Sequence, residues 1–561
     1  MRYMDEQAPN FTDYDSTRES FSWDAWLPKF SFHQSGKVNY GFEVADHQVA
    51  LGRGGHDAIV EQKPDGSVVR ITFAELAERS NAVAASLLAR GLKPGSRFGI
   101  YAPKSVEYAV VLLAVVKCGA IAVPLFDAFG KDAIIDRLGD CGAQWLYTTK
   151  ALRGAVIDAA LPALATILTE DDLPSLLEGP TQACAVFGDL ETPFMLHYTS
   201  GSTGKPKGIV LAQRAMIGHL VTALYVLDLK PEDKYWNTGD PGWVTGMVYN
   251  FFAPLLVGVT VHLYGGRFNA QEWVAFMARM GITVWYSSPT AFRLLRYHNA
   301  PLDRAHLPKL RHIVSAGEPL NPELIEWTER DLGIPIHDSW YMTEQGHQLI
   351  NNYRCLPVRP GSMGKPLPGV VAAILDESCR ELPPGQAGRL AIKVPWPGLM
   401  KEVWNNREKF DSYFEQGWYI SGDTAYRDED GYYWFKGRED DMIKSAGKRL
   451  SPFEIESALV SHPWVAEAGV IAKPSELFGS IVKAFVLLKP GHAPSEVFKE
   501  ELSSLVKDHS AAHLLTSEIE FVTSLPKTKS GKIMRRVLRA RETGGQDGDL
   551  STLDEEMNPD K

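Results

Sequence analysis

The sequence predicts an α/β protein, in which a large region with helices on both faces of parallel sheets is followed by a smaller α+β region. Three observations support this fold class. Apolar strand-like segments alternate with helical segments between residues 71 and 317. The local composition changes between residues 415 and 440, where aromatic residues, glycine and aspartate are closely spaced. The chain has 561 residues, 45% of them hydrophobic, which is enough for several packed units.

The first clear helix of the large region follows Ile71. Thr72 can cap it, Glu75 completes a capping box three residues later, and Gly91 ends it. The next expected elements are a buried strand at 97–102, a helix at 105–118, and buried strands at 120–126, 259–266, 282–288 and 310–317. Because a helix between two strands returns the chain to the same edge of a sheet, this alternation predicts parallel strands.

Hairpins are predicted between residues 415 and 440, and they mark a boundary. Beyond it, helices are expected at 452–460 and 496–507, and strands at 468–473 and 481–489. The end of the chain is acidic and poor in apolar residues, which is typical of a flexible tail. The expected units are a large domain at 1–438, a small domain at 439–540 and the tail at 541–561.

Composition excludes several classes of function. The net charge is −11, from 58 basic and 69 acidic residues. This charge argues against extensive electrostatic binding to nucleic acid or to an anionic membrane. The five cysteines form no C-x-x-C pair, and the polar N-terminus lacks the apolar stretch of a signal peptide. The apolar stretch 106–125 is interrupted by charge, glycine and proline, so no membrane span is expected. We therefore expect a cytoplasmic protein with reduced thiols.

The sharpest local signal is the glycine- and hydroxyl-rich segment 198–208. Its glycines can present backbone amides, and its hydroxyls and lysines add donors and positive charge, as a polyphosphate cradle requires. Pro206 stands where a Walker A loop needs glycine. A flexible linker is the alternative, but two lysines beside four hydroxyls argue against it. The candidate phosphate-binding residues are Thr199, Ser200, Gly201, Ser202, Thr203, Gly204, Lys205 and Lys207.

This segment and four later ones resemble, in order, the motifs of the adenylate-forming superfamily, which comprises acyl-CoA synthetases, adenylation domains and luciferases. The later segments are 315–319, 338–346, the pair 422–423 with 437–438, and 526–535. The resemblance is closest to acetyl-CoA synthetase and its short- and medium-chain relatives. It implies a large N-terminal domain with doubly wound mixed sheets and a small, mobile C-terminal α+β domain.

The resemblance also implies a set of residues that bind ATP and AMP. Asp423 could accept hydrogen bonds from both ribose hydroxyls, Trp340 could stack on adenine, and Glu344 could ligate Mg²⁺. Taken alone, these residues could equally be a turn aspartate, a core tryptophan and a surface glutamate. The implied ATP/AMP-binding residues are Gly317, Glu318, Pro319, Asp338, Ser339, Trp340, Tyr341, Met342, Thr343, Asp423, Arg438 and Arg449.

Lys532 matches the catalytic lysine of the family, and Glu344 is assigned with it to the catalytic set. A lysine on this turn can place a compact charge against the α-phosphate as charge develops there. A basic run is otherwise most often a solvated face. The implied reaction is attack of an ionised carboxylate on the α-phosphate of ATP, which yields acyl-AMP and pyrophosphate without a general base.

For the second half-reaction, the family rotates its small domain about a hinge that corresponds to Asp440. Gly447 would line the tunnel for the CoA thiol, since a glycine leaves room for close approach. Ala446 and Lys448 replace a serine and a histidine that are common at these positions in acetyl-CoA synthetases. The implied CoA-binding residues are Ala446, Gly447 and Lys507, and an implied cation site comprises Val460, His462 and Val465, although His462 could be an ordinary surface histidine.

Four residues are implied to line the acid pocket: Val244, Thr245, Ala316 and Tyr341. Val244 and Thr245 match acetate-specific relatives. Ala316 stands where those relatives have valine, which opens space, while Tyr341 replaces a tryptophan and stays bulky. We expect a short acid, from acetate to branched acids of three to five carbons, with a larger acid as the alternative if Tyr341 turns aside.

The predicted function is that of an AMP-forming acyl-CoA synthetase whose substrates are a small carboxylic acid, ATP with Mg²⁺, and CoA. The alternative is a stand-alone adenylating enzyme that passes a larger acyl-AMP to a partner enzyme or a carrier-protein thiol. A non-catalytic nucleotide-binding protein would be expected to lack Lys532, Glu344 or Asp423, and all three are present.

Overall fold

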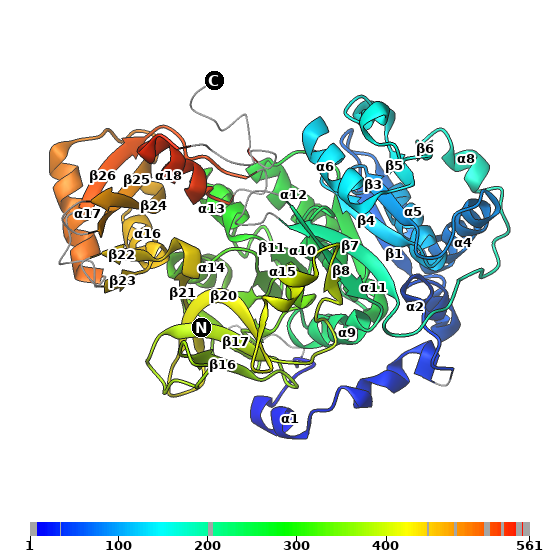
Figure 1. The fold of residues 1–561 in the computed structure, drawn as a ribbon, viewed down its shortest axis with the longest axis horizontal. Helices are drawn as coiled ribbons and strands as arrows, with labels where there is room; N and C mark the ends of the chain where they lie inside the picture. Colours follow the sequence, from blue (N-terminus) through cyan, green and yellow to red (C-terminus); the bar gives the residue numbers. More distant parts are fainter. Residues whose placement is uncertain are drawn as a thin grey trace.

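The computed structural model describes residues 8–33, 35–199, 206–445, 448–475, 479–509, 517–528, 532–545 and 553. A large domain built on two sheets carries a small C-terminal domain, coloured orange to red in Figure 1, against one side. This is the predicted class, mixed α/β with a smaller α+β domain. Among the described residues, no helix combines the length and apolar character needed to cross a bilayer.

The first sheet of the large domain has the strand order β18-β8-β7-β4-β3-β5-β6. Its central strands are parallel. At one side, β8 runs antiparallel to both of its neighbours, β7 and β18. Its strands are β3 (Arg97–Tyr101), β4 (Ile121–Leu125), β5 (Trp145–Thr148), β6 (Thr166–Leu168), β7 (Pro193–Thr199), β8 (Lys207–Ala212) and β18 (Glu402–Val403).

The second sheet has the order β16-β17-β20-β21-β15-β14-β13-β12-β11-β9-β10-β1-β2, with β19 beside β20. It is parallel from β1 to β13 and antiparallel beyond β13. Its strands are β1 (Asp57–Gln62), β2 (Val68–Thr72), β9 (Lys234–Asn237), β10 (Thr260–Tyr264), β11 (Val284–Ser287), β12 (His312–Ser315), β13 (Ile336–Trp340), β14 (Ile350–Asn351), β15 (Ser362–Pro366), β16 (Ala372–Leu375), β17 (Gly388–Lys393), β19 (Phe414–Glu415), β20 (Trp418–Arg427) and β21 (Tyr433–Arg438).

Helices cover these sheets and fill the space between them. α5 (Val106–Lys117) is buried along its whole length and contacts strands of both sheets, so it forms the centre of the core. The capping box on α4 (Phe73–Ala89) is present, since the backbone N–H of Thr72 donates to Glu75 at 2.8 Å. The other helices of this domain are α1 (Tyr14–Ser20), α2 (Tyr40–Glu43), α3 (Asp46–Gln48), α6 (Lys131–Cys141), α7 (Lys150–Arg153), α8 (Leu173–Leu176), α9 (Ala215–Tyr225), α10 (Val244–Phe251), α11 (Ala253–Val257), α12 (Ala270–Met280), α13 (Pro289–Tyr297), α14 (Pro322–Leu332) and α15 (Arg407–Asp411).

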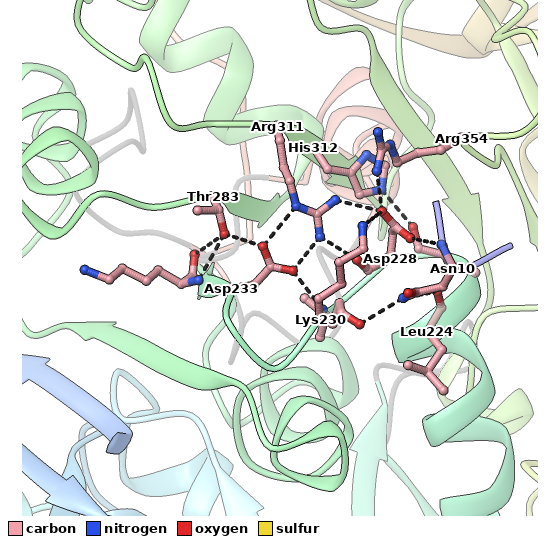
Figure 2. A network of polar contacts seen from close by, with 12 residues as sticks. Asn10, Leu224, Asp228, Lys230, Asp233, Thr283, Arg311, His312 and Arg354 are labelled. Atoms are coloured by element: carbon pink, nitrogen blue, oxygen red, sulfur yellow. Dashed lines mark hydrogen bonds and ion pairs between the residues drawn. The ribbon is translucent and has the colours of Figure 1, made fainter. Parts of the chain in front are cut away.

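A network of buried charges joins the amino ends of the parallel strands β9, β11 and β12 (Figure 2). The Arg311 guanidinium donates to Asp228 at 2.7 Å and also pairs with Asp233, and Arg354 reaches the same Asp228 carboxylate. The backbone N–H of Asn10 donates to Asp228 at 2.7 Å, which fastens the N-terminal segment to the domain. Since parallel strands share one direction, this network lies at the edge opposite their carboxyl ends.

The small domain follows the turn η6 (Glu439–Asp441). A three-stranded sheet, β24 (Val465–Ser475), β25 (Gly479–Leu488) and β26 (Ser517–Val522), and the hairpin β22 (Ile443–Ser445) and β23 (Lys448–Leu450) pack with α16 (Pro452–Ser461), α17 (Glu496–His509) and α18 (Arg535–Thr543). α18 includes the first three residues of the expected tail, since it ends at Thr543, and Leu553 is buried. The domain limits stay a prediction.

Candidate active site

Two predicted motifs meet at the carboxyl ends of β12 and β13. The strands are parallel neighbours, with Ser315 opposite Asp338, so the loop 316–319 and the segment 338–346 emerge side by side. Ser339 Oγ donates to the Ser315 carbonyl at 2.9 Å and ties the two together. The carboxyl edge of a parallel sheet is where open α/β folds bind ligands. The parallel pairing therefore assembles a site from segments separated in the sequence.

The proposed ribose contacts face one another on β20 and β21. Asp423 lies directly opposite Arg438 in the antiparallel pair, with 3.3 Å between Oδ1 and the guanidinium Nε. The Trp340 indole Nε1 donates to Asp423 Oδ2 at 2.8 Å. Burial raises the pKa of Asp423 to about 6, and Arg438, the Trp340 hydrogen bond and Lys532 act to lower it. Three predicted residues thus converge on one carboxylate.

Several buried polar atoms near these residues have no protein hydrogen-bond partner within the described part of the chain. They include Thr199 Oγ1 at the end of β7, Ser315 Oγ at the end of β12 and Asp338 Oδ1 on β13. Burial raises the pKa of Asp338 well above its usual range. Buried polar atoms are normally paired, so such a set fits a ligand that both donates and accepts hydrogen bonds, as a nucleoside does.

A tyrosine links the phosphate loop to the proposed magnesium ligand. Lys207 Nζ donates to the Tyr413 hydroxyl at 3.0 Å, and this hydroxyl donates to Glu344 Oε1 at 3.0 Å. Burial, followed by the charge of Glu344, raises the pKa of Tyr413, which keeps the hydroxyl protonated. Lys409 lies over the ring of Tyr413, 4.8 Å from its centroid. Tyr413 and Lys409 were not predicted from the sequence, because no local signal separates them from other aromatic and basic residues.

Glu344 is the one predicted Mg²⁺ ligand, and it is 8% exposed. No group of three or more His, Cys, Asp or Glu side chains with metal-binding geometry occurs among the described residues. A single carboxylate fits Mg²⁺ that arrives bound to ATP phosphates, since Mg²⁺ keeps waters and phosphate oxygens as its other ligands.

Lys532 of the small domain reaches this site. Its turn is held by two bonds with Thr528: the Thr528 N–H donates to the Lys532 carbonyl at 2.8 Å, and the Lys532 N–H donates to Thr528 Oγ1 at 3.1 Å. The Lys532 residue is exposed, and its charge is close enough to influence the pKa of Asp423. Desolvation and then the charges of Arg438 and Arg535 lower the pKa of Lys532, and Glu318 opposes them. The lysine therefore acts electrostatically on both Asp423 and the 316–319 loop.

The residues predicted to line the acid pocket lie on α10 and around the end of β13. Thr245 Oγ1 and the Tyr341 hydroxyl are 2.6 Å apart, and the Asn237 side chain donates to the Thr245 carbonyl at 2.9 Å. Tyr341 is 8% exposed, and its ring packs edge-on against Tyr249. Ala316 and Val244 are buried in the same core cluster. The hydroxyl of Tyr341 is thus turned toward the predicted threonine.

The remaining predicted residues are only partly described. Ser200–Lys205, Ala446 and Gly447 lie outside the described residues, as do the side chains of Arg449 and Lys507. Gly317 has φ +95°, and Glu318 turns toward Thr290, whose hydroxyl donates to both of its carboxylate oxygens at 2.8 and 2.9 Å.

Seven further predicted residues lie at element ends or turns. Pro319, Met342 and Thr343 are half-buried, and Asp440 is exposed in the turn η6. Both ring nitrogens of His462 have partners, Glu501 at 3.2 Å and the Trp464 N–H at 3.1 Å, while Val460 and Val465 lie in α16 and β24 on either side. The cation site and the hinge stay predictions.

Comparison with known proteins gives the family. Residues 46–404 match the model of the AMP-binding enzyme family, and residues 454–532 match its AMP-binding enzyme C-terminal domain. An acetyl-coenzyme A synthetase of Bacillus subtilis (strain 168) is 45% identical over 97% of this chain and 98% of its own length. The chain therefore belongs to the AMP-binding enzyme family of adenylate-forming enzymes. Within that family it is an AMP-forming acyl-CoA synthetase, an ATP-dependent acid–thiol ligase, as the motifs predicted.

Solved structures of the family have the same fold. A crystal structure of a Brucella canis acyl-CoA synthetase aligns with a TM-score of 0.74 at 34% identity, covering 95% of this chain and 99% of the other. An anthranilate CoA ligase in complex with anthranoyl-AMP aligns with a TM-score of 0.83 at 29% identity, covering 92% and 98%. The stand-alone adenylating alternative finds no support among these relatives.

Proposed function

We propose that this synthetase activates acetate or another short acid of up to five carbons. The observation that carries the choice of acid is the contact between Tyr341 and Thr245, whose oxygens are 2.6 Å apart. This contact holds the tyrosine ring at the proposed pocket, and the ring of Tyr249 packs edge-on against it. A ring fixed in this way limits the length of the acyl chain, since overpacking a closed site is costly.

Ala316 supports a pocket somewhat larger than acetate requires. It is 3% exposed, so its small side chain faces other protein groups and not solvent. When two acids differ by one methyl or methylene group, an apolar pocket changes the ratio of their kcat/KM values only modestly. We therefore propose a preference for short acids, including branched ones, and not strict selection of acetate. The similarity to the acetyl-coenzyme A synthetase of Bacillus subtilis supports the lower end of this range.

In the proposed first half-reaction, an oxygen of the ionised carboxylate forms a bond to the α-phosphorus of ATP. The bond from that phosphorus to the bridging β-phosphate oxygen breaks, and pyrophosphate leaves. Lys532 stabilises the charge that builds up on the α-phosphate, and Asp423 holds the ribose. Lys207 contacts phosphate oxygens, and Glu344 would hold Mg²⁺, which neutralises phosphate charge when bound.

In the proposed second half-reaction, the CoA thiol loses its proton to solvent and the sulfur attacks the acyl carbonyl carbon. The bond to AMP then breaks, so a thioester and AMP are formed. We propose that Ala446, Gly447 and Lys507 bind CoA in this step, that Arg449 contacts the phosphate of the nucleotide, and that Asp440 is the hinge by which the small domain reorients. The cation site at Val460, His462 and Val465 is kept as a subsidiary proposal.

A panel of carboxylic acids tests this function, with pyrophosphate release measured in the presence and absence of CoA. We expect the highest catalytic efficiency among acids of two to five carbons, and AMP release that depends on CoA. Equal or better use of benzoate or a polycyclic acid would contradict the proposed pocket. Full turnover without CoA would contradict the proposed acceptor.

A further inference from the structure

A chain of alternating charges crosses from the small domain to the nucleotide loop. Lys527 forms an ion pair with Glu467, and both side chains are nearly inaccessible, 6% and 9% exposed. Glu467 Oε1 lies 4.0 Å from the Nε of Arg293, and Arg293 Nη2 donates to Glu318 Oε2 at 2.5 Å. Lys527 and Glu467 belong to the small domain, and Arg293 and Glu318 to the large one.

The small-domain end of this chain supports the Lys532 turn. Lys527 pairs with Ile533 in an isolated β-bridge, so the two strands of the turn meet at this point. Thr528, the next residue, makes both backbone-directed hydrogen bonds that hold Lys532. A carboxylate that fixes Lys527 therefore fixes the base of the turn that carries the lysine.

The large-domain end supports the nucleotide loop. Glu318 is held by the hydroxyl of Thr290 and by the guanidinium of Arg293. Arg293 also donates to Asn321 at 3.3 Å, and the Asn321 side chain donates to Ser457 Oγ of the small domain at 2.9 Å. Arg293 thus links the small domain to the nucleotide loop. It contacts Glu467 directly and Ser457 through Asn321, and it donates to Glu318 of the loop.

We propose that Glu467 is a positioning residue for the adenylation half-reaction, which holds the Lys532 turn in register with the nucleotide loop through Arg293. Without its charge, Lys527 and Arg293 would be two cations facing each other at a closed interface. The proposal rests on the proposed role of Lys532. It concerns only the domain arrangement in which Lys532 is at the site, since the Arg293–Glu467 contact spans the two domains.

The test compares the two half-reactions in Glu467→Gln. Because a displacement of about 1 Å in an active site can cost about 100-fold, we expect acetate-dependent pyrophosphate release to fall by about 10- to 100-fold. Thioester formation from supplied acetyl-AMP and CoA should stay within about twofold of wild type, since Lys532 is assigned to the first step alone. An equal loss in both steps, or no loss in either, would overturn the proposal.

Glu520→Gln is the matched control. Glu520 lies on β26 of the same sheet and pairs with Lys483 at 2.7 Å, entirely within the small domain. Both half-reactions should keep the wild-type rate. A selective adenylation loss in this control as large as that of Glu467→Gln would overturn the proposal, because any lost ion pair of the small domain would then suffice.

A double-mutant cycle adds a measurement that would show no coupling if Glu467 only stabilised the small domain. If Arg293→Met and Glu467→Gln remove the same coupling, their combined effect on adenylation should be smaller than the product of the single effects. Multiplicative effects would overturn the proposal. If Glu467→Gln does not fold, Glu467→Asp supplies the same half-reaction comparison with the same readings. Failure of the proposed function is separate, because wild type itself would then release no pyrophosphate with short acids.

Discussion

The Trp340 indole donates a hydrogen bond to Asp423 at 2.8 Å, which joins the end of β13 to β20 within the proposed nucleotide site. The same carboxyl group faces Arg438 at 3.3 Å. Despite these partners, burial raises the pKa of Asp423 from the usual 3.8 to about 6. This carboxylate is therefore held charged at some cost to folding, which is common where function requires a buried charge.

Replacing Asp423 by Asn should lower activity and raise stability together. Loss of the charged acceptor for the ribose should reduce kcat/KM for ATP about 10- to 100-fold. Because the folded pKa lies above that of unfolded aspartate, stability falls as pH rises from about 4 to about 6. At pH 7.5 the variant should be more stable by about 1–3 kcal/mol. Thermal unfolding at pH 4 and pH 7.5 checks this: a gain of equal size at both pH values would contradict it.

Lys532→Ala should lower acyl-AMP formation about 100- to 1,000-fold, the usual cost of losing a charge-stabilising group, while thioester formation from supplied acyl-AMP is retained. The wild-type adenylation rate should also fall at alkaline pH, earlier than an ordinary lysine would allow, since desolvation lowers the pKa of Lys532. Pyrophosphate release across a pH series measures both. Lys499→Ala, on α17 and paired with Glu496, is the control. Parallel loss of both half-reactions would contradict this role.

Gly447→Leu should have the reverse effect, because a side chain at this position would obstruct the approach of the CoA thiol. Pyrophosphate release with acetate should remain within about twofold of wild type, while CoA-dependent AMP release should fall at least about tenfold. Each is measured separately in a single-turnover assay. Undiminished transfer to CoA would show that the tunnel runs elsewhere.

Tyr341→Ala should widen the range of acids. Removing the ring and its contact with Thr245 should reduce kcat/KM for acetate at least about tenfold and shift the benzoate-to-acetate ratio by about 100-fold toward benzoate. Tyr341→Phe, which keeps the ring, should retain most of the preference for short acids. Tyr235→Phe, in a buried tyrosine of β9, is the control for general packing. An unchanged acid ratio in Tyr341→Ala would remove Tyr341 from the pocket.

Tyr413→Phe should weaken the binding of ATP. Without the hydroxyl, Lys207 and Glu344 lose the group that separates and orients them, so we expect KM for ATP to rise about tenfold. The KM for acetate should change little, because the tyrosine lies on the phosphate side. Steady-state kinetics with each substrate varied distinguish the two, with Tyr426→Phe on β20 as control. A larger effect on acetate than on ATP would contradict the assignment.

Local patterns in the sequence were sufficient to predict the elements on which the site is built. The strand 97–102, the helix 105–118 and the helix 452–460 agree with β3, α5 and α16 to within a residue at most positions. Most predicted strands ran one or two residues past the observed ends, whereas the strand predicted at 468–473 stopped two residues before the end of β24, because the backbone pairing that ends a strand is set by its neighbour. α18 and β26 were missed, since polar and charged residues hide their periodicity.

By itself, the sequence determined the α/β class and the order of the five motifs, because hydrophobic periodicity and motif spacing are properties of adjacent residues. The kind of reaction was implied by the resemblance of those motifs to the adenylate-forming superfamily. Only the tertiary structure decided that Tyr341 turns its hydroxyl to Thr245, 96 residues away, and that Tyr413 lies against Glu344, 69 residues away. Only it brought Glu467 to Arg293 across two domains. Such contacts depend on how sheets and domains pack, and no local pattern encodes which distant side chain will be met.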